Sequence, residues 1–113
     1  MKNFTKVMKS LSDPIRVKIL KMLQKKAMCV CEIQHALKIA QSTTSKHLKI
    51  LEASGLITSK KNGLWVNYFI ADGSISPYAA SLLGNLRHWL EDEPEIIALM
   101  KILPNINRDN LLN

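Results

Sequence analysis

The stretch Gln41-Ser42-Thr43-Thr44-Ser45-Lys46-His47-Leu48 decides the fold of this chain. Its side chains are short, polar or basic, and they lead into the apolar positions Leu48 and Leu51. A three-residue spacing of apolar side chains places both on one face of a helix. Because Gly55 follows as a stop signal, we predict a helix over residues 41–53 with one buried face and one polar face.

Three further helices are predicted upstream of this one. Ser12-Asp13-Pro14 is typical of a helix start, with a capping side chain followed by proline at the first helical position. Apolar residues then recur at four-residue steps, which indicates a buried stripe. The expected helices cover residues 2–9, a segment from Pro14 with Ile15, Ile19 and Leu23 buried, and residues 30–38, with Lys38-Ile39-Ala40 as the turn before Gln41.

The second half of the chain predicts one hairpin and two more helices. Residues 56–59 and 65–70 are β-prone, and Asn62-Gly63 between them is a strong hairpin signal. Helices are expected over residues 76–91 and from Pro94 to Leu103. The fold class is therefore mainly α with a β-hairpin: a dimeric winged helix-turn-helix whose wing tip is residues 60–63. Residues 1–103 form the DNA-binding and dimerisation domain, and residues 104–113 are expected to be a frayed tail.

Charge is distributed unevenly along the 113 residues. The net charge is +7, with +10 on residues 1–62 and −3 on residues 63–113, which favours a polyanion at the N-terminal part. No apolar run approaches the roughly 18 residues of a membrane span, so no membrane partner is expected. No stretch resembles a signal peptide, so we expect a cytoplasmic protein with reduced thiols.

The polar face of the helix over residues 41–53 has the side chains needed to contact DNA. In a helix-turn-helix this helix enters the major groove, where amide, hydroxyl and basic groups reach base edges and phosphates. A plain amphipathic surface helix is the alternative. Lysines in the hairpin would contact phosphate or the minor groove, or would only keep it soluble. The expected DNA-facing residues are Gln41, Ser42, Thr43, Ser45, Lys46, His47, Lys60 and Lys61.

Cys29 and Cys31 are the only cysteines, and they are two residues apart. Within a regular helix they would be separated by about 200°, so chelation of one ion requires a non-helical backbone. They fall at the start of a predicted helix, where a thiolate is favoured. We therefore expect ion binding to pull the first turn out of helical geometry and to tilt a helix that supports the DNA-reading element.

The available donors narrow the choice of ion. A structural zinc site needs four ligands, and His35, four residues after Cys31, could at most complete a set of three. Two thiolates without further donors favour As(III) or Sb(III), bound as an inducer and not as a permanent cofactor. An organoarsenical such as methylarsenite would need only two sulfurs.

Four stretches resemble motifs of the arsenical-resistance repressor (ArsR/SmtB) family, over roughly residues 4–92. The resemblance implies a homodimer paired through its first and last long helices. It also implies a repressor that leaves a two-fold symmetric double-stranded DNA operator when a thiophilic ion binds. The stretches are Ser12–Leu20, Cys29–Ile33, Gln41–Leu51 and Gly55-Leu56-Ile57.

The sequence departs from this family at three positions. Ala40 stands where the capping serine is frequent, so Gln41 or Ser42 would have to cap the helix, and Thr44 replaces an aliphatic residue. The third cysteine of some members would fall at Gln34. His88 with Glu91 resembles only half of the His and carboxylate pairs of zinc and nickel sensors.

Three other functions remain as alternatives. The first is a thiol-redox-responsive repressor of the same fold that uses no metalloid. The second is a small thiol oxidoreductase, but the spacing is Cys-x-Cys and not Cys-x-x-Cys, and no alternating strand-helix pattern surrounds it, so we expect no enzyme. The third is a winged helix that only contacts proteins.

Overall fold

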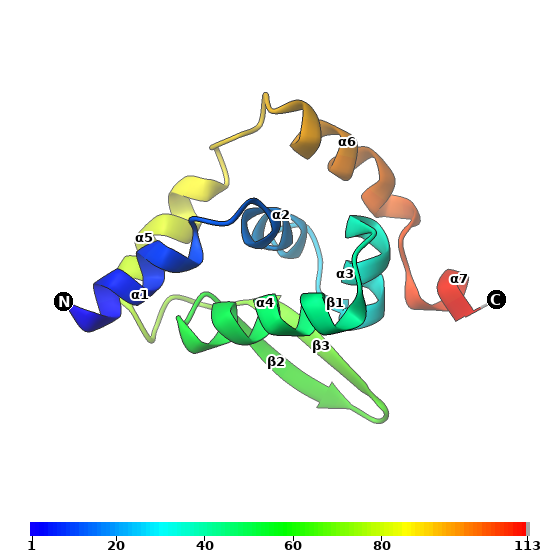
Figure 1. Ribbon diagram of the computed structural model, residues 1–113, viewed down its shortest axis with the longest axis horizontal. Helices are drawn as coiled ribbons and strands as arrows, with labels where there is room; N and C mark the ends of the chain where they lie inside the picture. The colour runs from blue at the N-terminus through cyan, green and yellow to red at the C-terminus, as the bar shows by residue number, and fades with distance from the viewer. Residues whose placement is uncertain (113) are drawn as a thin grey trace.

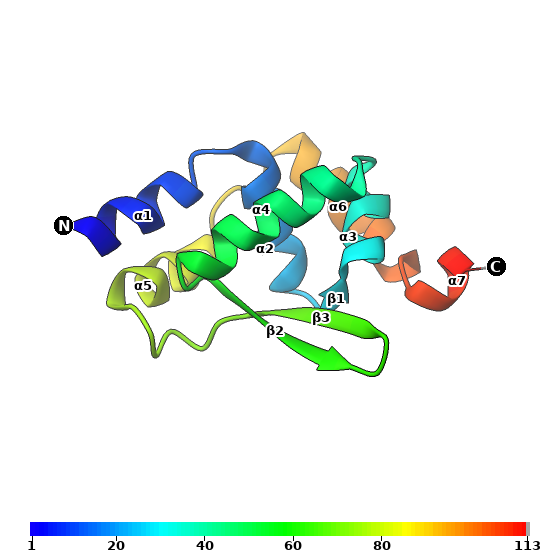
Figure 2. The same cartoon turned by 60° about the horizontal axis from the view of Figure 1, so that its bottom comes forward.

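The computed structural model describes residues 1–112 (Figure 1). A small antiparallel sheet with strand order β1-β3-β2 lies at one edge of the helices, and its hairpin extends beyond them (Figure 1, Figure 2). Within this part of the chain, no helix has both the length and the apolar character needed to span a membrane. The elements are α1 (Lys2–Ser10), α2 (Pro14–Leu23), β1 (Met28–Cys29), α3 (Val30–Leu37), α4 (Gln41–Ala53), β2 (Ile57–Asn62), β3 (Trp65–Ile70), α5 (Pro77–Leu86), α6 (Pro94–Ile102), the 3-10 turn η1 (Leu103–Asn105) and α7 (Arg108–Leu112).

Helix α2 is central to the core. Its start was predicted correctly: Asp13 is the N-cap, its carboxylate accepts the Ile15 N–H at 2.8 Å, and Pro14 occupies the first turn. Of the predicted buried stripe, Ile19 is fully buried and Leu23 is nearly so, whereas Ile15 is only half-buried. The helix packs against α4, α6 and β3, so its position sets the position of α4.

Helices α3 and α4 form the helix-turn-helix. Lys38 ends α3 in the left-handed conformation, and α4 covers the predicted residues 41–53. Ala40 is the N-cap of α4 and provides no side-chain hydrogen bond, so neither Gln41 nor Ser42 replaces the missing cap. The buried Thr44 hydroxyl donates to the Ala40 carbonyl at 3.0 Å, which satisfies its polar group inside the core.

The hairpin is one step longer than predicted. Strand β2 continues through Asn62, which pairs with Trp65, so the two-residue turn is Gly63-Leu64 and not Asn62-Gly63. Gly63 has φ +64°, which only glycine adopts without strain, and it is the first central residue of the turn. Lys60 and Lys61 therefore lie on strand β2 and not at the tip, which projects from the body (Figure 2).

Strand β1 was missed by the sequence analysis because it is only two residues long. Met28 pairs with Tyr68 and Cys29 pairs with Asn67, so β1 is an edge strand beside β3. The segment that carries the first thiol is therefore part of the same sheet as the wing.

Helix α5 is shorter than the predicted 76–91 segment. The buried Lys21 on α2 donates from Nζ to the carbonyls of Leu86 and Trp89, both at 2.9 Å, and to Glu91 Oε1 at 3.2 Å. These carbonyls would otherwise continue the α-helical ladder, and Leu90 adopts φ +65°. The Lys21 ammonium group from α2 therefore ends α5. The spacing of apolar residues in the sequence could not predict this contact.

The segment after Leu103 also differs from the expected frayed tail. Ile106 is buried, and Lys26 Nζ donates to the carbonyls of Leu103 and Ile106. The Arg108 N–H donates to Glu32 Oε2 at 3.0 Å, which fixes the start of α7 against α3. Asn113, the last residue of the predicted tail, lies outside the described residues.

The arrangement confirms the predicted fold class of helices with a β-hairpin. Helices α2, α3 and α4 followed by the β2–β3 hairpin make a winged helix-turn-helix. Helices α1 and α5 lie side by side at the end of the molecule opposite α7 in both views (Figure 1, Figure 2). There Phe4 and Tyr78 stack edge to face at 5.2 Å, and both rings remain partly exposed.

Candidate nucleic-acid interface and thiol site

The two thiols already point to the same side. Cys29 ends β1 and is the N-cap of α3 with φ −89° and ψ 170°, so its backbone is extended. Cys31 is the second residue of α3, and the two Sγ atoms lie 2.8 Å apart. The expectation that an ion must unwind the first turn is therefore wrong, because Cys29 is outside the helix before anything binds.

Cys29 is nearly fully buried, and Cys31 is half-buried. Burial, together with the hydrogen bond to Cys31 and the nearby Glu32 carboxylate, raises the pKa of the Cys29 thiol to about 12. The Glu32 backbone N–H acts in the opposite direction but is outweighed. The expectation of a thiolate at the helix N-terminus is thus wrong for Cys29, which is a thiol at neutral pH.

Glu32 connects the thiol site to the C-terminal segment and to the wing. Its Oε1 accepts the Cys29 N–H at 2.8 Å, and its Oε2 accepts the Arg108 N–H. The Arg108 guanidinium lies 4.5 Å from the centre of the Trp65 ring on β3. Neither Glu32 nor Arg108 was predicted as a site residue. Glu32, three positions after an N-cap, carries a capping-box signal that could have been found, whereas nothing local marks Arg108.

The donor set at this site is the two thiols alone. Within residues 1–112 no group of three or more His, Cys, Asp and Glu side chains is placed to hold a metal ion. The set of Cys29, Cys31 and His35 therefore does not form. Glu91, half of the possible pair with His88, is bound by Lys21 instead.

The polar face of α4 is open to solvent. Gln41, Ser42, Thr43 and Lys46 are exposed and Ser45 is half-buried, whereas Leu48 and Leu51 on the other face are fully buried. Lys49 was missed by the sequence analysis, although its spacing from Ser42, Ser45 and Lys46 places it on the same face. A shallow surface hollow of about 500 Å³ is lined by Ser42, Thr43, Ser45, Lys46 and Lys49.

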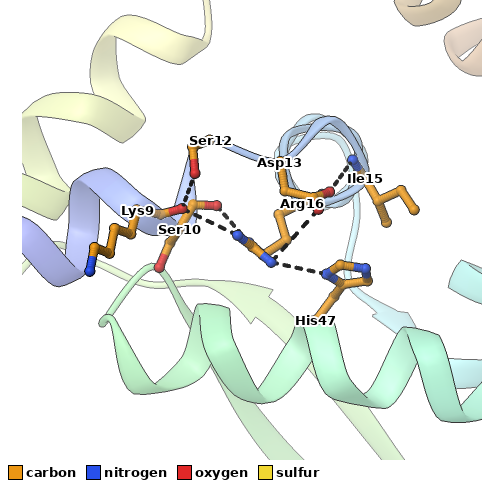
Figure 3. A network of polar contacts seen from close by, with 7 residues as sticks. All are labelled: Lys9, Ser10, Ser12, Asp13, Ile15, Arg16 and His47. Atoms are coloured by element: carbon orange, nitrogen blue, oxygen red, sulfur yellow. Dashed lines mark hydrogen bonds and ion pairs between the residues drawn. The ribbon is translucent and has the colours of Figure 1, made fainter.

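His47 is placed differently from its neighbours. Its ring is half-buried, and Nδ1 lies 3.2 Å from Nη1 of Arg16 on α2 (Figure 3). Of the predicted DNA-facing residues on α4, Ser42, Thr43, Ser45 and Lys46 line one surface hollow, Gln41 is exposed at the start of the helix, and His47 points toward α2.

The two wing lysines have different surroundings. Both are exposed on β2, and Lys60 Nζ lies 5.9 Å from the centre of the Phe69 ring, within cation–π range. Lys61 is exposed beside the tip. Because they are consecutive on a strand, the two side chains point to opposite faces of the hairpin.

A winged helix-turn-helix with a basic polar recognition helix defines a class of DNA-binding regulators. Residues 13–59 match the family described as bacterial regulatory protein, arsR family. The chain is 41% identical over 70 residues to an uncharacterised HTH-type transcriptional regulator of Methanocaldococcus jannaschii, covering 61% of this chain and 79% of that protein. It is 31% identical over 103 residues to the arsenical resistance operon repressor of Escherichia coli K12, covering 90% and 83%.

The fold is also shared with a solved structure of this class. A homodimeric winged helix-turn-helix domain of Mycobacterium bovis, a possible ArsR-family regulator, is 24% identical with a TM-score of 0.67, covering 83% of each chain. Several other curated relatives are matched over only about half of their own length. This chain belongs to the ArsR family: it is a DNA-binding transcriptional repressor and not an enzyme.

Proposed function

We propose that this repressor leaves its operator when As(III) or Sb(III) binds Cys29 and Cys31. The single observation that carries the proposal is the 2.8 Å separation of two thiols at the junction of β1 and α3. Soft trivalent ions prefer sulfur ligands. Within the described residues no third His, Cys, Asp or Glu side chain joins the two sulfurs, so the pair suits such an ion better than zinc.

The raised pKa of Cys29 favours neutral arsenous acid over a divalent cation. When As(OH)3 reacts with two thiols, two As–S bonds form and two As–O bonds break. Each thiol proton leaves with a hydroxide as water, so no net proton is released. A divalent cation needs both thiolates and releases two protons, so its affinity must rise with pH. Because Cys29 is buried, the inducer reaches the site from the side of Cys31.

On the DNA side we propose that α4 enters the major groove and the wing contacts phosphate. Gln41, Ser42 and Thr43 lie at the N-terminal end of α4, where no side chain caps the helix and backbone N–H groups face outward. Ser45, Lys46 and Lys49 extend the same face, and Lys60 and Lys61 follow on the hairpin.

We further propose a homodimer paired through α1 and α5, acting in the cytoplasm on an operator with two-fold symmetry. Phe4, Met8 and Tyr78 leave apolar surface exposed where these helices meet. A two-fold pair would cover this surface and would present two α4 helices to successive major grooves, roughly 34–36 Å apart.

Anisotropy titrations on the DNA upstream of the gene test the inducer. Arsenite should weaken wild-type binding by at least about tenfold, with a midpoint that hardly changes between pH 6.5 and 7.5. Cys29→Ser and Cys31→Ser should bind DNA as the wild type does and ignore arsenite. Cadmium is the comparison ion, and its midpoint should fall steeply with pH. An arsenite response that persists in both variants would show that Cys29 and Cys31 are not the arsenite-binding residues.

The thiol distance also favours a redox switch as a second candidate. Two adjacent thiols and one hydrogen peroxide give a disulfide and two waters. The raised pKa of Cys29 works against this route because the thiolate is the reacting species. Release from DNA by peroxide, reversed by dithiothreitol and accompanied by indifference to arsenite, would select this candidate over the first.

A further inference from the structure

Arg16 joins three helices through one side chain. Its Nε donates to the Ser10 carbonyl at 2.8 Å, and Nη2 donates to the Lys9 carbonyl at 3.2 Å, both at the C-terminal end of α1 (Figure 3). Its Nη1 lies 3.9 Å from Asp13 Oδ2 at the cap of α2 and 3.2 Å from His47 Nδ1 on α4. Only 13% of the side chain is exposed, so the contacts are made largely out of water.

The contact between Arg16 and His47 restricts which ring nitrogen of His47 can carry the proton. A guanidinium group donates hydrogen bonds and accepts none. A hydrogen bond between the two side chains therefore requires His47 Nδ1 as the acceptor, which places the ring N–H at Nε2. A protonated ring would place a second N–H against the Arg16 donors and set two cations together. The ring atom that holds α4 to α2 is thus Nδ1, and Nε2 is the one polar atom left for another partner.

We propose that Arg16 and His47 are positioning residues that fix the angle of the recognition helix α4 against the end of α1. This inference rests on the proposed DNA-binding mode and goes beyond it, since neither residue needs to touch a base. Helix α1 packs beside α5 and carries the Phe4 side of the proposed dimer surface. Fixing α4 to α1 therefore fixes the separation of the two recognition helices in the dimer, and with it the half-site spacing.

Two isosteric substitutions separate a positioning role from base contact. Asparagine places its carbonyl oxygen close to the position of Nδ1, whereas glutamine places its polar end close to Nε2. His47→Asn keeps an acceptor for Arg16, and His47→Gln keeps a group that could reach DNA. Arg16→Lys keeps the charge but loses the fork that spans α1 and α4. His88→Asn, at an exposed site after α5, is the matched control.

The probe is a duplex selected by the wild-type protein from a randomised pool, with a second copy carrying one inserted base pair between the half-sites. Wild type, His88→Asn and His47→Asn should prefer the selected duplex over the inserted one. His47→Gln and Arg16→Lys should lose about tenfold of that preference while keeping their affinity for random DNA. Circular dichroism melts confirm that each variant is folded.

The outcomes distinguish failure of the proposed DNA-binding mode from failure of the positioning role of Arg16 and His47. If the wild type selects no duplex above random DNA, the proposed DNA-binding mode fails. If selection succeeds but His47→Gln binds like the wild type and His47→Asn does not, His47 contacts DNA through Nε2 and the positioning role is overturned. Equal loss on selected, inserted and random duplexes in both His47 variants overturns it as well.

Discussion

At the scale of single residues, Asp13 shows how one carboxylate serves both a helix and its neighbours. Burial alone would raise its pKa. The hydrogen bonds from the N–H groups of Ile15 and Arg16, together with the positive charge of Arg16, outweigh burial and lower the pKa of the Asp13 carboxyl below its usual value. A lowered pKa in the folded state contributes stability above the unfolded value, and this contribution is lost as the pH falls through the folded value.

Asp13→Asn tests this contribution. Asparagine caps a helix as well as aspartate but carries no charge. At pH 7 the variant should be less stable than the wild type by about 0.5–1 kcal/mol, since the pair with Arg16 is partly exposed. The difference in unfolding free energy from urea titrations should shrink below pH 4 and vanish at lower pH. A difference that is constant across this range would contradict the assignment.

At the scale of elements, lysines from the α2 region determine where two later helices end. Lys21 binds the last carbonyls of α5, and Lys26 binds carbonyls after α6. The N-terminus of α4 is the opposite case, because its cap residue, Ala40, has no side chain that could accept a hydrogen bond. The Lys21 and Lys26 contacts and the uncapped start of α4 all involve backbone groups at helix ends that have no hydrogen-bond partner within the helix.

Lys21→Met should destabilise the protein by about 1–3 kcal/mol, because the buried Leu86 carbonyl loses a charged donor while the volume is kept. Lys18→Met is the matched control on the same helix, where the side chain is 26% exposed and its Nζ lies 3.7 Å from Glu95 Oε1. The control should lose under about 1 kcal/mol. Chemical denaturation measures both, and equal losses would show that burial of Lys21 is not what matters.

Ala40→Ser should stabilise the protein by about 0.5–1 kcal/mol, since the extended backbone at this position lets a hydroxyl accept an N–H of the first turn. Ala53→Ser, the exposed last residue of the same helix, is the control and should give no gain. Thermal melts compare the two. If both variants melt together, the hydroxyl at residue 40 does not cap α4.

At the scale of the whole molecule, the exposed lysines of α4 and β2 lie on the proposed DNA surface, and Phe4, Met8 and Tyr78 leave apolar side chains exposed where α1 and α5 meet. Tyr78→Glu should convert the proposed dimer into a monomer and weaken operator binding at least about tenfold, because both half-sites must be held together. Ile97→Glu on α6, at a similarly exposed position, should leave the dimer intact. Sedimentation velocity measures the state, and a dimeric Tyr78→Glu would place the interface elsewhere.

The wing gives a second prediction at this scale. Lys61→Ala should lower the affinity for all DNA sequences alike and reduce the slope of log K against log salt by about 0.9. Lys101→Ala on α6, away from the hairpin, should leave the slope unchanged. Titrations at several salt concentrations supply both slopes, and an unchanged slope for Lys61→Ala would exclude a phosphate contact.

The sequence predicts best where the signal is local. Asp13-Pro14 carries a cap for α2, and the run from Gln41 to Leu51 has apolar residues at helical spacing, so α2 and α4 start where expected. The thiol geometry was not predictable in the same way, because it depends on Cys29 pairing with Asn67, far along the chain. The early end of α5 depends on Lys21, and the position of residue 106 depends on Lys26. The spacing of apolar residues in the sequence does not reveal contacts made by single side chains from another helix.

The pairing of Cys29 with Asn67 has a thermodynamic consequence for the sensor. Cys29 on β1 pairs with Asn67 on β3, so an ion bound at the sulfurs and DNA bound at the hairpin, both as proposed, would act on adjacent strands of one sheet. Coupling of this kind is reciprocal. The factor by which the bound ion lowers the affinity for DNA is the factor by which bound DNA lowers the affinity for the ion. We therefore expect the operator-bound repressor to respond at higher inducer concentrations than the repressor free in solution.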